Sequence, residues 1–118
     1  MGVDYGCEKF YSAFNYVIVS NGSLQDRLEA VISGVSHLQR DSFPDDEMWN
    51  RFQELLSATT KLPARTPSEG TISATTAQMT EDEARKWLQE ALFIFAGLHE
   101  AYGKGNGQTL SDSDSTLN

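Results

Sequence analysis

Reactive and metal-binding residue types are scarce in this sequence of 118 residues, which has one cysteine and two histidines. One cysteine allows no intrachain disulfide, and without a Cys/His cluster a structural zinc site is not expected. We therefore expect a cytoplasmic protein in which Cys7 is a buried, inert thiol.

Basic residues are also few and dispersed. Nine lysines and arginines stand against seventeen aspartates and glutamates, which gives a net charge of −8 with neutral histidines. Phosphate backbones and anionic membrane surfaces both attract clustered basic residues, and only Arg85 and Lys86 are adjacent here. The longest uncharged apolar stretch, 91–98, is far shorter than the roughly 20 residues of a membrane span. We expect neither nucleic acid nor a membrane as a partner.

Catalytic motifs are missing as well. The sequence contains no glycine-rich phosphate loop and no Gly-x-Ser-x-Gly nucleophile elbow. His37 and His99 each fall near the end of a predicted helix, where the helix dipole accounts for them. We therefore predict a protein that is not an enzyme and that uses no cofactor or metal.

What the sequence does contain is a series of amphipathic segments. Apolar residues recur at spacings of three and four over residues 5–20, 23–40, 44–60 and 80–102, which indicates four helices. The run 16–19 is also compatible with a strand, but the helical period covers the whole segment. The residues expected to be buried are Cys7, Phe10, Tyr11, Phe14, Val17, Ile18, Leu24, Leu28, Val31, Ile32, Val35, Leu38, Met48, Trp49, Phe52, Leu55, Leu56, Thr59, Ala84, Trp87, Leu88, Ala91, Leu92, Phe95, Leu98 and Tyr102.

Helix start signals support these segments. Thr80 with Glu83 forms a full capping box, and Ser23 with Asp26 forms a weaker one. Pro44 can open the third helix, since its missing N–H is not needed in the first turn.

The connections complete the predicted architecture. Residues 61–70 contain two prolines and a glycine and predict a loop, whereas 71–78 fit a short helix across the end of a bundle. Gly103 is expected to end the last helix. We predict an all-α fold, a compact bundle of four main helices with a short extra helical segment before the last helix. This domain spans 1–103, and 104–118 form a flexible polar tail.

A set of positions between Asp41 and Trp87 resembles a pattern in small bacterial proteins. It consists of Phe43-Pro44, Phe52, Leu56, Gly70-Thr71-Ile72, Ala74-Thr75, Met79 and Glu83-Ala84. The resemblance is to a family of small all-helical bacterial or phage proteins with no assigned function. It implies a compact helical domain and brings no catalytic residues.

Several apolar residues leave the predicted core stripes. Phe93 points about 160° away from Ala91, and Gly97 follows one turn later, where it would let another backbone approach. Tyr16 and Val19 leave the stripe of the first helix in the same way. These four residues form a predicted interface, either with a partner or in a homodimer. The alternative is that the last helix is central and is buried on more than one side by its own chain.

Acidic residues are densest at Asp41, Asp45, Asp46 and Glu47. Such a patch can occupy a basic groove that otherwise binds nucleic acid. The alternative explanation is that helix capping and a solubilising surface account for all four residues.

Two functional hypotheses follow. The favoured one is a small acidic non-enzymatic protein that binds another protein, in an accessory, inhibitor or immunity-type role. The alternative is a small-molecule or metal-dependent bundle, similar to helical nucleotide hydrolases, that uses Asp26, Glu29 and His37. A polar cavity with converging carboxylates would favour the alternative, and a filled apolar core would favour the binding protein.

Overall fold

The chain folds into helices joined by short connections, as a computed structural model shows for the backbone of residues 2–114 and the side chains of residues 2–104. The elements are α1 (Val3–Ile18), α2 (Leu24–Val35), the 3₁₀ turn η1 (Arg40–Ser42), α3 (Asp46–Thr59), α4 (Thr71–Ala77) and α5 (Glu81–Asp114). No strand occurs in this part of the chain, so the predicted all-α class is confirmed. Nor does any helix within it have the length and apolarity needed to cross a membrane.

Both predicted capping boxes are present. The Ser23 hydroxyl accepts the Asp26 N–H at 3.1 Å, and the Asp26 carboxylate accepts the Ser23 N–H at 3.2 Å. The matching distances between Thr80 and Glu83 are 3.1 and 2.8 Å. In each box the two side chains satisfy N–H groups that have no partner within the helix.

The third helix begins at Asp46, two residues later than predicted. Its N-cap is Asp45, whose carboxylate accepts the Met48 N–H at 2.9 Å, and Pro44 lies outside the helix. A capping carboxylate satisfies an N–H of the first turn, which proline cannot do.

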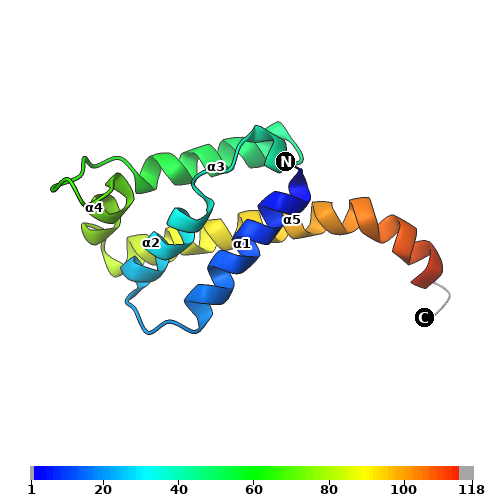
Figure 1. Cartoon of the computed structure of the whole chain (residues 1–118), viewed down its shortest axis with the longest axis horizontal. Coiled ribbons are helices and arrows are strands. Elements are labelled where there is room, and N and C mark those ends of the chain that lie inside the picture. Colours follow the sequence, from blue (N-terminus) through cyan, green and yellow to red (C-terminus); the bar gives the residue numbers. More distant parts are fainter. Residues whose placement is uncertain (1, 115–118) are drawn as a thin grey trace.

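Helix α5 is the central element. It packs against α1, α2 and α3, while the short α4 packs against α2 and α3. Figure 1 shows α3 and α5 extended along the long direction of the molecule, with α1 crossing α5 obliquely. This agrees with the alternative in which the last helix is covered on several sides.

The core is apolar. Phe10, Phe52, Leu28, Ile94 and Leu98 are completely buried. The Phe10 ring packs edge-on against Phe52 with centroids 6.1 Å apart. The buried polar residues of the described part of the chain are Ser42, Thr59, Thr75 and Thr76. No carboxylate lies among these residues, so a polar cavity with converging acids is not observed there.

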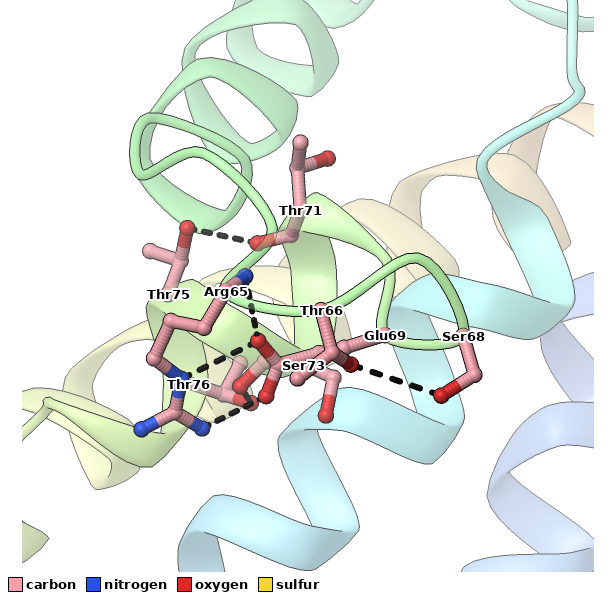
Figure 2. Close-up of polar contacts among 8 residues, drawn as sticks. All are labelled: Arg65, Thr66, Ser68, Glu69, Thr71, Ser73, Thr75 and Thr76. Atoms are coloured by element: carbon pink, nitrogen blue, oxygen red, sulfur yellow. Dashed lines mark hydrogen bonds and ion pairs between the residues drawn. The ribbon is translucent and has the colours of Figure 1, made fainter.

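The segment before α5 is held by hydroxyl groups and one ion pair (Figure 2). The Thr75 hydroxyl donates to the Thr71 carbonyl at 2.7 Å and accepts the Leu62 N–H at 3.0 Å. Arg65 pairs with the Glu69 carboxylate inside the loop. These contacts fix the predicted loop and confirm a short helix at 71–77.

Two predicted helix ends are wrong. The second helix ends at Val35 rather than near Arg40, and α5 continues past Gly103 to Asp114. A glycine ends a helix by adopting a left-handed conformation, and no described glycine has a positive φ. Residues 115–118 of the predicted tail lie outside the described residues, and the flexibility of the tail stays a prediction.

Candidate functional site

Exposed large apolar side chains gather on two helices. Within the described residues they all belong to α1, its C-cap or α5: Tyr11, Tyr16, Ile18, Val19, Leu92, Phe93 and Tyr102. Isolated exposed apolar residues are ordinary, but their concentration on one helix pair makes α1 and α5 the first place to look for a binding surface.

Four of these residues were expected in the core. Tyr11, Ile18, Leu92 and Tyr102 are 60, 77, 52 and 41% exposed, so their predicted burial is wrong. The buried face of α1 includes Phe10 and Val17, and each following residue lies about 100° further round the helix.

Stacked aromatic rings between α1 and α5 connect the buried core to the surface. The half-buried Phe14 and Phe95 stack with centroids 5.8 Å apart, and Phe95 stacks in turn on the buried Phe10 at 6.4 Å. We call the resulting surface the α1/α5 seam. It consists of the half-buried Phe14 and Phe95 together with exposed residues that lie three, four or seven positions from them along the same helices and so share their faces: Tyr11, Ile18, Leu92 and Tyr102.

A groove with a volume of about 460 Å³ lies at one end of the seam. The first half of α1 meets the second half of α5 there. The lining residues are Gly2, Asp4, Tyr5, Cys7, Glu8, Tyr11, Phe95, His99 and Tyr102. The lining is thus aromatic and acidic, and it includes no lysine or arginine.

The cysteine of the groove is not an activated nucleophile. Cys7 is 8% exposed, and burial raises its pKa because the thiolate would lose its hydration. The thiol therefore stays protonated near neutral pH, as expected for an inert cysteine.

The predicted interface residues divide between two places. Phe93 and Gly97 lie on the α3 side of α5, in a second groove that Pro44, Asp45 and Met48 also line. No described contact joins them to Tyr16 or Val19, which are exposed at the end of α1.

Phe93 is half exposed and partly covered by its own chain. The Arg51 guanidinium lies 4.0 Å from the centroid of the Phe93 ring. Two hydrogen bonds of 2.9 and 2.8 Å join Arg51 to the Glu90 carboxylate. This contact raises the pKa of Arg51, so the guanidinium stays charged over the ring.

Gly97 lies close to a side chain of its own molecule. A Cβ atom there would meet the methyl group at the flexible end of the Met48 side chain of α3. Spacing along one helix cannot show this contact, because it does not say which element lies opposite. The predicted role of Gly97 in an interface stays a prediction.

The acidic patch is exposed but partly engaged. Asp45 caps α3, and the Asp46 carboxylate accepts a hydrogen bond of 3.0 Å from Arg40. Capping and pairing thus engage two of the four predicted residues, and the binding of the patch to a basic groove stays a prediction. Asp41 lies in η1 and Glu47 in the first turn of α3.

The residues of the metal-dependent alternative are not brought together. Asp26 belongs to the capping box at the start of α2, and His37 follows its end, roughly three helical turns away. His37 Nε2 instead lies 3.0 Å from the Tyr5 hydroxyl. Glu29 cannot bridge that separation. Within residues whose side chains are described, no three His, Cys, Asp or Glu residues form a group that could hold a metal ion.

The sequence carried a signal for the groove that periodicity analysis missed. Asp4, Glu8 and Tyr11 follow i, i+4, i+7 spacing and therefore share one face of α1. That face lies beside the apolar stripe, and a search for apolar periodicity alone does not mark it as a site.

No family model matches this chain, and neither the curated proteins nor the solved structures that were searched give a match. The resemblance to small bacterial or phage proteins therefore stays a prediction.

Proposed function

We propose that this chain is a small non-enzymatic protein that binds a partner protein through the α1/α5 seam, in an accessory, inhibitor or immunity-type role. The observation that carries this proposal is the concentration of exposed apolar side chains on α1 and α5. Protein-binding surfaces commonly combine such aromatic and aliphatic anchors with a polar rim.

The seam offers anchors of sufficient size. Leu92 and Tyr11 expose more than half of their surface, next to an inner layer that is already packed. Full burial of an exposed apolar side chain contributes roughly 1.5–3 kcal/mol, so covering the exposed half of such a residue contributes about half of that. Several anchors along the helix pair are therefore needed for a specific contact.

Charge selects the partner. The chain carries a net charge of −8, and the groove that continues the seam contains Asp4 and Glu8 but no lysine or arginine. A partner with apolar anchors flanked by lysine or arginine complements this surface and is attracted to it over long range. A second copy of the chain would bring the same negative charge.

Leu92 and Phe93 provide a matched pair of variants. They are adjacent, 52 and 51% exposed, and point about 100° apart around α5, with Phe93 beside Arg51 of α3. Leu92→Glu places a charge in the seam, and Phe93→Glu places the same charge on the α3 side. Since both positions are half exposed, we expect both variants to fold with a loss of at most about 1 kcal/mol.

The experiment combines these variants with a photoreactive amino acid. Placed at Leu92, it should cross-link one defined basic partner in cells, and at Gln53 on α3 it should not. The purified partner should bind Leu92→Glu at least about tenfold more weakly than Phe93→Glu.

Other results would contradict the proposal. Equal binding of the partner to both variants would exclude the seam as the interface. Light scattering would show whether the wild-type chain forms a dimer. A dimer that Leu92→Glu dissociates and Phe93→Glu does not would mean that a second copy of the chain, and not a basic partner, covers the seam.

A further inference from the structure

The groove at the end of the seam has the chemistry of a site for an organic cation. We infer that it binds a substituted ammonium group, a small-ligand function beyond the docking of a partner along the seam. The inference is carried by three features of the groove, which are its aromatic lining, its carboxylates and its volume.

Four aromatic side chains line the groove: Tyr5 and Tyr11 from α1, and Phe95 and Tyr102 from α5. The face of an aromatic ring carries negative electrostatic potential and attracts cations. Alkylated ammonium ions suit such a lining, because they are weakly hydrated and lose little when water is displaced. Tyr5 already attracts an ammonium group, since Lys9 Nζ lies 5.3 Å from the centroid of its ring.

Carboxylates supply the countercharge. Asp4 and Glu8 are exposed, one helical turn apart, on the face of α1 that lines the groove. No lysine or arginine belongs to the lining, and the nearest cation described is Lys9, whose ammonium group lies over the Tyr5 ring. The bonds and ion pairs described for the chain engage neither carboxylate, in contrast to Asp46 and Glu90 on α3 and α5. A cation in the groove would therefore meet aromatic side chains and negative charge, and Tyr11 and Tyr102 are the more exposed of these rings.

The size of the groove fits a small ligand. Its volume of about 460 Å³ lies within the range of roughly 300–1,000 Å³ that is typical of small-molecule sites. The groove is open, and Tyr11 and Tyr102 are 60 and 41% exposed, so a ligand can reach their rings. The same ammonium chemistry occurs in free small molecules and in trimethylated lysine side chains.

Tetramethylammonium chloride is the direct probe, titrated into the full chain and followed by NMR at constant ionic strength. We expect saturable shifts of the ring signals of Tyr5, Tyr11 and Tyr102, and no such shifts with sodium or plain ammonium chloride. Glu8→Gln and Tyr11→Leu should each weaken binding by roughly three- to tenfold. Glu54→Gln, which removes an equally exposed charge from α3, should leave binding unchanged.

Choline and a peptide with trimethyllysine then distinguish the two sources. Tighter binding of choline would indicate that the natural ligand is a free small molecule. Tighter binding of the trimethylated peptide, without binding of its unmethylated form, would indicate a modified side chain of the proposed partner. Equal shifts with sodium or ammonium, or unchanged binding in a folded Glu8→Gln variant, would overturn the inference. Because this titration needs no partner, its failure would leave the seam proposal standing.

Discussion

At the scale of single residues, Gly6 is required by a close backbone contact. A Cβ atom at Gly6 would lie 2.8 Å from the Ser42 carbonyl oxygen, and a backbone atom cannot move aside cheaply. Overpacking of this kind costs about 1–3 kcal/mol, which exceeds the helix propensity of about 1 kcal/mol gained by alanine. Gly6→Ala should therefore lower the free energy of unfolding by about 1 kcal/mol in urea denaturation.

Gly103 is the matched control for Gly6. It lies in α5, and a Cβ atom there would meet nothing within 4 Å. Gly103→Ala should stabilise the protein by about 0.5–1 kcal/mol, because alanine favours the helix. If Gly6→Ala instead raised the free energy of unfolding, the Ser42 backbone in η1 would have moved away from the new methyl group without cost. A destabilising Gly103→Ala would contradict the continuation of α5 beyond this residue.

Glu69 gives a pH-dependent contribution to stability. Hydrogen bonds from the Arg65 side chain and backbone lower the pKa of Glu69 from 4.5 to about 2. A lowered pKa in the folded state stabilises the protein above the unfolded value, and this contribution is lost as the pH falls from about 4.5 to about 2.

The corresponding variant is Glu69→Gln. Its melting temperature should be lower than that of the wild type at pH 6, and the difference should shrink to nothing near pH 2. Comparison of the two proteins at each pH cancels the titration of the other carboxylates. A difference that is the same at both pH values would mean that the carboxylate charge contributes nothing in this loop.

At the scale of elements, the start of α5 depends on its capping box. The Thr80 hydroxyl and the Glu83 carboxylate satisfy each other's backbone N–H groups. Thr80→Ala should cost about 1 kcal/mol in chemical denaturation, since an N–H of the first turn loses its partner. The Thr80 backbone and side chain also lower the pKa of Glu83, so the contribution of the box weakens as the pH falls below the ordinary range of glutamate.

Ser23→Ala tests whether this sensitivity is particular to α5. It removes the equivalent hydroxyl from the box of α2, and it should destabilise the protein by a similar amount. An unchanged denaturation midpoint in Thr80→Ala alone would mean that the packing of α5 on three other helices fixes its start without the cap.

At the scale of the whole molecule, α5 explains why the two predicted interface pairs separate. It packs against α1, α2 and α3, so side chains on different faces of α5 lie beside different helices. The Phe93 ring lies beside Arg51 of α3, whereas Leu92, its neighbour in the sequence, points about 100° away around α5. Tyr11 and Ile18 of α1 add exposed apolar surface to the α1/α5 seam.

The sequence by itself determined the helices, their caps and most of the core. Helical periodicity and capping residues depend on contacts within a few residues, so Ser23, Thr80 and Phe52 were correctly assigned from spacing alone. Only the tertiary structure decided which flank of each apolar stripe is covered, because that depends on where the other helices lie. Tyr11 and Leu92 have the spacing of core residues, yet they are exposed. Ile94 was not among the residues expected in the core, yet it is completely buried. Gly97 lies close to the Met48 side chain of another helix. The groove likewise exists only because α1 and α5 bring Asp4, Glu8 and Tyr102 together across the chain.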